Sequence, residues 1–252
     1  MEFQPIIKTK KNLSDEVRDS LTSYVKQMDI RKSLKLPSEQ TLSANLGVSR
    51  VTLRRALDEL EQSGLVIRIH GKGTFVNPEA LQIQLNLGEG SELMESIIRC
   101  GYDARVELVR TAEYPASKKL AAILQVEEGA AIVEIEKVFY ADQNPAIVCI
   151  DRFCKDILYR PIDDEEYITT IFELLRRTAG KIVVRDKVEV LSVIKKEMKK
   201  FSQYADKMNC DSMLVFNSIN YDQDNVPVIY DTEFYNTNYI RFTLLRSKKI
   251  SY

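Results

Sequence analysis

Two arginines, Arg50 and Arg54, stand four residues apart in the segment SRVTLRRALDEL, where the spacing of apolar residues predicts a helix. Side chains at positions i and i+4 project from the same flank of a helix. A guanidinium group can hold O6 and N7 of guanine with two parallel hydrogen bonds, which contribute about 1–3 kcal/mol of base discrimination. Ser49 and Thr52 add hydroxyls that can reach a phosphate or a base edge, and free N–H groups near Ser49 favour a phosphate. The segment can therefore read duplex DNA, although an ordinary solvated helix face also carries some arginines.

Three short helices are expected to position these side chains. Apolar residues recur at helical spacing over residues 13–28, where Ser14 is the candidate cap. A second helix is expected from Ser38, whose hydroxyl can accept a hydrogen bond from a free N–H of the first turn, to Gly47. The third helix starts directly afterwards and carries the arginines. A helix, a tight turn and a second helix form a helix-turn-helix layout, which places its second helix in a DNA groove.

A hairpin is expected after the third helix, in the segment LVIRIHGKGTFV. Ile67 and Ile69 alternate with polar residues, as in a half-buried strand. The tip is formed by His70, Gly71 and Lys72, and its glycines let the backbone approach a minor groove or a phosphate closely. His70 is the single histidine of the chain, so we expect no histidine-based metal site.

Composition limits the class of protein further. A length of 252 residues predicts one large or two modest domains. The composition, with 44% hydrophobic and 29% charged residues, excludes a disordered, collagen-like or disulfide-scaffold protein. Residues 1–78 hold 13 basic against 9 acidic residues, a net charge of +4, whereas the remainder carries −5, which suggests a basic surface facing a polyanion. The four cysteines show no CxxC spacing and are expected to be reduced thiols. With neither an apolar run of membrane-spanning length nor a secretory signal, we expect a cytoplasmic protein outside the membrane.

The rest of the chain is expected to form a linker and an α+β domain. Residues 77–90 have proline and glycine near their ends, which is typical of a linker, and we expect them to act as a hinge. Two similar units, each a strand, a polar turn ending in proline and a second strand, suggest a weak internal repeat and a largely antiparallel sheet. Helices are expected at residues 91–101, 117–124, 167–178 and 195–208, and strands at 106–111, 131–140, 146–153, 187–194, 213–221, 228–235 and 241–246.

The segment LPSEQTLSANLGVSRVTLRRALDELEQSGLVIRIHGKGTFV closely resembles the winged helix-turn-helix of GntR-family bacterial transcription regulators. This resemblance implies a homodimer on a palindromic DNA operator. One departure is Gln40, which stands where the family usually has arginine and lacks the charge for a strong phosphate contact. The candidate DNA-binding residues are Ser38, Gln40, Ser49, Arg50, Thr52, Arg54, His70, Gly71 and Lys72.

The second half is similar, more loosely, to the UTRA effector-binding domain of the HutC-type subfamily, whose sheet resembles that of chorismate lyase. The similarity rests on ELMESIIRCGYDA, LAAILQVEEGAAIVEIEKVFYADQNPAIV, TTIFELLRRTAGKI and DNVPVIYDTEFYNTNYIRF. It implies a small-molecule effector such as a sugar, a sugar phosphate or another metabolite. Where the subfamily often has two arginines, this chain has Lys137 and Phe139, which favours a less charged or larger effector. The candidate effector-binding residues are Ser91, Lys137, Phe139, Thr170, Phe172, Tyr235 and Asn236.

The sequence thus predicts three parts: a winged helix-turn-helix domain at residues 1–76, a linker at 77–90, and an effector-binding domain at 91–252. The predicted function is a sequence-specific transcription regulator, a repressor, whose operator affinity depends on a bound metabolite. The alternative is a chorismate-lyase-like enzyme fused to a DNA-binding domain. Against it, the second half has no histidine, no nucleophile elbow and no phosphate loop, and nothing in the sequence pairs Asp151 with Glu233 for acid–base work. We therefore expect no catalytic residue, metal or cofactor.

Overall fold

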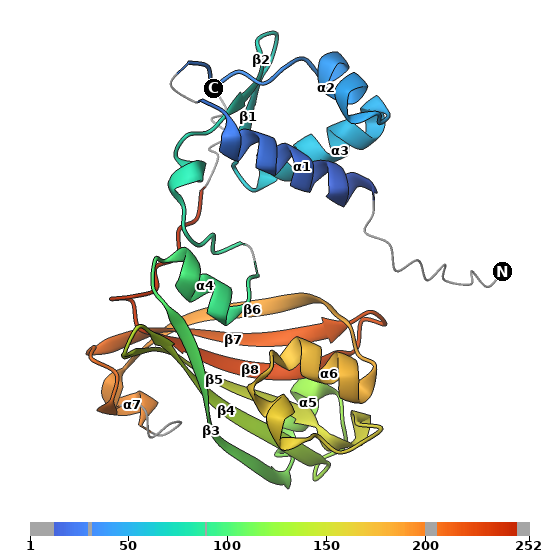
Figure 1. Ribbon diagram of the computed structural model, residues 1–252. Coiled ribbons are helices and arrows are strands. Elements are labelled where there is room, and N and C mark those ends of the chain that lie inside the picture. The colour runs from blue at the N-terminus through green and yellow to red at the C-terminus, as the bar shows by residue number, and fades with distance from the viewer. Residues whose placement is uncertain (1–12, 30–31, 89, 200–205, 246–252) are drawn as a thin grey trace, which may run out of the picture. The chain divides into compact units, whose positions relative to one another are not determined.

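The computed structural model describes residues 13–29, 32–88, 90–199 and 206–245. By its internal contacts the chain forms two compact units, residues 1–89 with 243–252, and residues 90–242 (Figure 1). This division places the last residues with the first unit, whereas the sequence groups them with the second. The domain boundaries at residues 76 and 91 stay a prediction.

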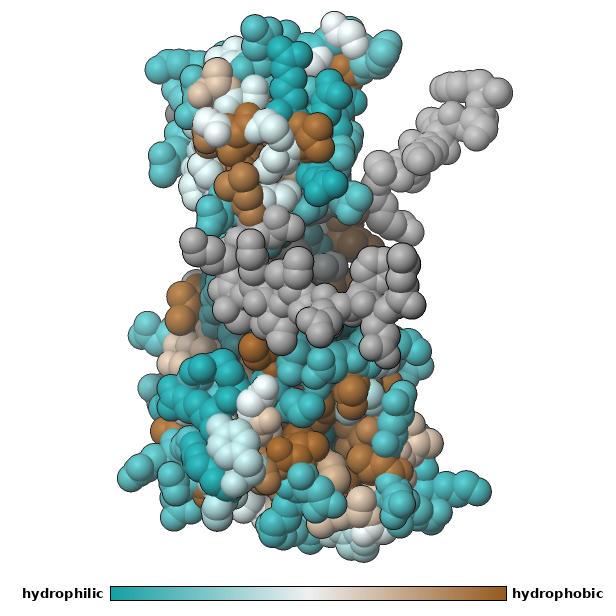
Figure 2. All heavy atoms as spheres, turned by 90° about the vertical axis from the view of Figure 1, so that its right-hand side faces the viewer, coloured by the Kyte–Doolittle hydropathy of each residue, from teal (hydrophilic) through white to brown (hydrophobic). Residues whose placement is uncertain are grey.

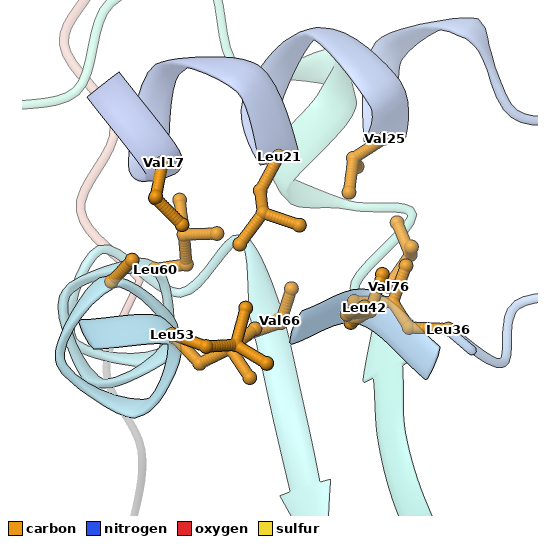
Figure 3. Close-up of a cluster of buried hydrophobic side chains, with 11 residues drawn as sticks. Val17, Leu21, Val25, Leu36, Leu42, Leu53, Leu60, Val66 and Val76 are labelled. Carbon is orange, nitrogen blue, oxygen red and sulfur yellow. The ribbon is translucent and has the colours of Figure 1, made fainter. Parts of the chain in front are cut away.

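Three helices and a hairpin make up the first unit: α1 (Leu13–Gln27), α2 (Glu39–Leu46), α3 (Arg50–Gln62), β1 (Val66–Ile69) and β2 (Gly73–Val76). The inward side chains of all five elements form one apolar core, in which Leu53 and Leu57 of α3 are fully buried (Figure 3). The helices expected from the sequence form with nearly the expected bounds, because their apolar residues recur at the spacing of one helix face.

Two local expectations in this unit are wrong. Ser14 does not cap α1: it lies inside the first turn and is 7% exposed, and its hydroxyl has no partner in the described part of the chain. In β1 the isoleucines face outward, with Ile67 47% and Ile69 42% exposed, while Val66 is buried. Alternation along a strand fixes its period but not which set of side chains faces the core.

The linker segment contacts the far end of the chain. After a short 3₁₀ turn at Ala80–Gln82, the backbone N–H of Leu87 donates to the carbonyl of Thr243 (2.9 Å), and that of Thr243 donates to Leu85 (2.9 Å). Leu245 packs over Gly64, where a Cβ would lie 2.9 Å from the leucine Cδ1. Residues 241–245 form no strand beyond this single bridge, so the expected strand at 241–246 is absent from the described residues.

The second unit is built on one antiparallel sheet of six strands in the order β3-β4-β5-β8-β7-β6 (Figure 1). The chain order divides it into two three-stranded halves, which meet where β5 pairs with β8. This arrangement agrees with the repeat of strand, turn and strand that the sequence suggests. The strands are β3 (Ala104–Pro115), β4 (Ala131–Ala141), β5 (Asn144–Cys154), β6 (Val183–Ile194), β7 (Ser212–Asp222) and β8 (Pro227–Tyr235).

Helices cover both faces of this sheet. Helix α6 (Ile171–Ala179) packs its apolar side against Val133, Ile135 and Phe153 on one face. On the other face, α5 (Lys118–Leu124) packs against Ile132 and α7 (Lys195–Met198) against Val215. Helix α4 (Leu93–Arg99) packs on β3 and β4. Helix α6 starts later than the expected 167–178 because a separate 3₁₀ turn occupies Asp164–Ile168, and part of the expected helix 195–208 lies outside the described residues.

Candidate DNA-binding surface and effector site

Two capped helix starts form the candidate DNA-binding surface. The Ser38 hydroxyl accepts from the N–H of Thr41 (3.1 Å) at the start of α2, and the Ser49 hydroxyl accepts from the N–H of Thr52 (3.1 Å) at the start of α3. Between the helices, Gly47 adopts φ +64°, a left-handed conformation that glycine tolerates best. Both serine hydroxyls therefore serve as caps, which leaves the neighbouring N–H groups to face an anion.

Arg50 and Arg54 are both exposed, as reading a DNA groove requires. The Nε of Arg54 donates to Glu39 on α2 (2.8 Å), which raises the pKa of the guanidinium and orients it, while 63% of the side chain stays exposed. No protein partner is recorded for Arg50 in the described residues. Gln40, beside Glu39, is exposed too. The sequence did not indicate the Glu39–Arg54 pair, since it joins residues 15 apart through the crossing of two helices.

The hairpin tip is exposed and held at its base. His70, Gly71 and Lys72 are exposed, and Gly71 has φ +71°. Behind them, Arg68 binds Asp58 on α3 through Nη1 (2.5 Å) and the Arg54 carbonyl through Nη2 (3.2 Å). These hydrogen bonds join the β1–β2 hairpin, which is the wing of the winged helix-turn-helix, to α3, the helix that carries Arg54.

The candidate effector residues gather on the α6 face of the sheet. Strands β4, β5 and β8 place their odd-numbered residues there, and their register puts Lys137, Cys149 and Glu233 in one row. Phe139, Ile147 and Tyr235 form the next row. This topology brings Lys137 and Phe139 near Tyr235, although about a hundred residues separate them in the chain.

Two further candidates, Thr170 and Ser91, belong to the segments next to Lys137. The Lys137 ammonium donates to the carbonyl of Thr169 (2.6 Å), directly before the candidate Thr170, whose hydroxyl caps α6. The cap residue of α4 is Glu92 rather than Ser91, and the Ser91 hydroxyl is hydrogen-bonded to that of Ser96 (2.7 Å). Burial, opposed by Lys137 and by a hydrogen bond from Thr170, raises the pKa of Glu92.

The remaining candidates differ in burial. Phe139 is 8% and Tyr235 3% exposed, and the Tyr235 ring lies 4.9 Å from the rings of Phe216 and Phe242 between centroids. Asn236 is buried, and its Nδ2 has no hydrogen-bond partner in the described part of the chain. Phe172, by contrast, is 37% exposed on α6.

The sequence analysis named Asp151 and Glu233 but did not place them together, and it did not single out Asp231, which lies with them on the same face. Asp151 and Asp231 are paired in register across β5 and β8 and are buried, and Glu233 follows two residues later. Burial and the neighbouring Glu233 raise the pKa of Asp231 well above its usual range, and burial together with Asp151 raises that of Glu233 to about 7. One feature of the sequence could have indicated this acidic group: the segments CIDRF and IYDTEFY place acidic residues inside otherwise apolar strands.

The opposite face of the sheet holds a cavity of about 460 Å³ between α5 and strands β6 to β8. Its polar side chains are largely engaged with one another: Arg152 binds Glu134 (2.8 Å) and Thr232 (3.2 Å), and the Tyr114 hydroxyl also donates to Glu134 (2.8 Å). No candidate effector residue lines this cavity. Within the described residues, no cluster of histidine, cysteine and acidic side chains could hold a metal, and no helix could cross a membrane.

Two family profiles match the chain. Residues 13–76 match the profile described as bacterial regulatory proteins, gntR family, and residues 99–241 match the UTRA domain. The chain is 30% identical over 176 residues to the HTH-type transcriptional repressor NagR of Bacillus subtilis, which covers 69% of this chain and 71% of the repressor. It is 26% identical over 230 residues to the uncharacterized HTH-type transcriptional regulator YurK of the same organism. This match covers 91% of this chain and 93% of YurK.

Solved structures share the fold. The possible transcriptional regulator YydK of Bacillus subtilis superposes with a TM-score of 0.69 at 18% identity, covering 94% of this chain and all of that one. PhnF from Mycobacterium smegmatis superposes with a TM-score of 0.55 at 24% identity, and the match covers 92% of this chain and all of PhnF. Because both sequence identities are below 25%, these superpositions show a shared fold.

Proposed function

Because the chain belongs to the GntR family and carries a UTRA domain, it is a metabolite-modulated DNA-binding regulator rather than an enzyme, and we propose that it is a cytoplasmic repressor that binds its operator as a homodimer. The observation that supports the DNA contact best is the exposed pair Arg50 and Arg54 beside two capped helix starts. We propose that these residues, with Gln40 and the wing tip, contact the operator, and that Ser38, Ser49 and Thr52 position them.

A selection experiment tests this proposal. The full chain is incubated with random duplex DNA, and bound sequences are recovered and read. We expect a palindrome whose half-sites are centred about one helical turn, or a multiple of it, apart, because a twofold dimer presents two equivalent helices. A single asymmetric site, or no enrichment, would contradict the dimeric arrangement or the specific DNA binding respectively.

We propose that strand β6 provides a surface for the dimer. Edge strands of soluble proteins are normally protected by charge. Both edge strands carry charged residues, namely Arg105, Glu107 and Arg110 on β3 and Arg185, Asp186, Lys187 and Glu189 on β6. Of the two, β6 also exposes large apolar side chains: Val184, Val188, Val190, Leu191 and Ile194. Single apolar residues elsewhere on the surface (Figure 2) are ordinary. Val188, Val190 and Ile194 share one face of β6, whose outer edge has no neighbouring strand in the sheet, and this apolar row fits burial against a second copy.

Substituting Val190→Lys tests this surface. A lysine at the contact would bury a charge, so we expect the mass in solution, measured by light scattering, to fall from about twice 29.0 kDa to the monomer value. Val226→Lys in the β7–β8 turn is the matched control, since Val226 is equally exposed (43%) but outside β6. A Val190→Lys protein that remains dimeric would exclude β6 as the main contact.

We further propose that the effector binds on the α6 face, at Lys137, Thr170, Tyr235 and their neighbours. The support is that strand register and the Lys137–Thr169 hydrogen bond gather these positions on one covered face. Asp231 Oδ2 and Asn236 Nδ2 are buried there and have no hydrogen-bond partner among the described residues. Relatives are named as repressors of histidine and, as a probable assignment, fructoselysine utilization. The effector proposed here is accordingly a small nutrient-derived metabolite that shifts the population of operator-competent dimers.

A further inference from the structure

Resting on the proposal that the α6 face holds the effector, we infer that the effector is an organic ammonium compound whose charged nitrogen binds at Asp231 and Glu233. The carboxyl groups of Asp231 and Glu233 lie on the same face of β8, next to Asp151 on β5. Asp231 is 5% exposed, while Glu233 keeps part of its surface open. Three carboxyl groups therefore line the proposed site, and the partly exposed Glu233 is the one that solvent reaches.

Within the part of the chain that the structure describes, no lysine or arginine forms an ion pair with Asp231 or Glu233. Asp231 is held by neutral donors, the amide of Asn220 and the hydroxyl of Ser218, and Glu233 accepts from the Tyr235 hydroxyl (2.5 Å). The charged groups that act most strongly on Glu233 from neighbouring segments are acidic: Asp151 on β5, Asp186 on β6 and Glu92 before α4. Lys137, separated from Glu233 in the register by Cys149, acts on Asp151 and Glu92.

One oxygen of the group is left without a donor. Asp231 Oδ2 is buried, and within the described residues it has no hydrogen-bond partner. A buried acceptor without a donor destabilises the ligand-free protein, so such atoms are rare outside functional sites. A ligand ammonium would donate to Oδ2 and would favour the ionised form of these carboxyl groups, which burial and mutual repulsion disfavour in the ligand-free protein.

Aromatic rings border the same position. Phe216 is paired in register with Glu233, and its ring packs with those of Tyr235 and Phe242 at centroid distances of 4.8–4.9 Å. Faces of aromatic rings attract ammonium groups and give an apolar surface for the carbon skeleton of an amine. A phosphate or carboxylate would instead be repelled by any of these carboxyl groups that is ionised, and its own charge would disfavour their ionisation further.

The first test compares stability without any ligand. Glu233→Gln keeps the acceptor for Tyr235 but removes a repelling charge. Because the folded-state pKa of Glu233 is raised to about 7, its contribution to stability is present at low pH and is lost as pH rises through about 7. We therefore expect Glu233→Gln to raise Tm by about 2–4 °C or more at pH 8, with a smaller change at pH 5.

Glu134→Gln is the matched control, because Glu134 is also a buried carboxyl of the sheet but binds Arg110, Arg152 and Tyr114. Burial acts to raise the pKa of Glu134, yet these partners outweigh burial and lower it. Glu134→Gln should therefore lower Tm at pH 8. If Glu233→Gln also lowers Tm there, the acidic group is an ordinary structural network and the inference is wrong.

The second test uses matched probes with the full chain. Phenethylamine and 5-aminopentan-1-ol provide an aromatic and a polar amine, and their N-acetyl derivatives keep the skeleton but lose the charge. We expect at least one amine to raise Tm and to bind about tenfold or more tightly than its N-acetyl partner. Its affinity should increase from pH 6 to pH 8, as Glu233 loses its proton, and should fall in Glu233→Gln.

Failure of this inference can be told apart from failure of the proposed function. If no amine outperforms its neutral partner, the ammonium assignment is overturned, whether or not another class of metabolite is found to release the operator. If the selected operator is bound and a neutral or anionic metabolite releases it, the regulator proposal stands and the ammonium inference falls. If no specific DNA is bound, the regulator proposal itself fails.

Discussion

Replacing Arg54 by alanine is expected to weaken operator binding about 5- to 150-fold, the range that corresponds to one lost bidentate base contact of about 1–3 kcal/mol. Glu39 engages only the Nε of Arg54, so the two terminal nitrogens remain for DNA. Arg50→Ala should have an effect of similar size, and the double variant should leave mainly salt-sensitive, non-specific binding. Fluorescence anisotropy with the selected operator, at two salt concentrations, measures these losses.

Arg99→Ala provides the control for charge. Arg99 is an exposed arginine on α4 of the second unit, so its loss changes the net charge equally but leaves the candidate DNA-binding surface intact. We expect a change in operator affinity of less than about twofold, since a single exposed charge that does not contact the DNA is largely screened at physiological salt. Equal losses for Arg99→Ala and Arg54→Ala would show that only overall charge matters, and the assigned docking would be wrong.

Leu53→Ala should unfold the first unit or leave it marginally stable. Leu53 is fully buried between α1, α3 and the hairpin (Figure 3), and truncating such a leucine costs about 2–5 kcal/mol. That is a large part of the roughly 5–15 kcal/mol by which a domain is usually stable. Urea denaturation followed by circular dichroism should show an early transition for this unit, and operator binding should disappear with it.

The neighbouring Val51→Ala is the control for this measurement. Val51 is 65% exposed, so its truncation removes little buried surface and should change the free energy of unfolding by about 0.5 kcal/mol or less. A Leu53→Ala variant with the same denaturation midpoint as Val51→Ala would mean that α3 is not held by this core.

Local signals made the helix-turn-helix predictable. Ser38, Gly47 and Ser49 each fix a helix end through bonds to residues a few positions away, and the structure confirms all three. The orientation of β1 was not predictable in the same way, because both Val66 and Ile67 are apolar and only the packed core decides which faces inward.

Contacts that depend on topology were beyond the sequence. The Glu39–Arg54 pair requires the crossing of α2 and α3, and the meeting of Asp151 with Asp231 requires β5 to pair with β8. Once the halves of the sheet join at that pair, acidic residues 80 positions apart become neighbours. Family resemblance supplied positions such as Lys137 and Tyr235, but it did not supply Asp231 or the pairing that brings Asp151, Asp231 and Glu233 to one face.

The return of Thr243 to Leu85 and Leu87 means that the second unit is an insertion, tethered to the first at both of its ends. Tyr235 and Asn236 lie only eight and seven residues before that attachment point. A ligand that displaces the end of β8 would act on the short segment that joins this strand to the bridge at Thr243. A chain shortened after residue 242 would lack this bridge and the contact of Leu245 with Gly64. We therefore expect the shortened protein to bind its ligand without the change in operator affinity that the ligand causes in the full chain.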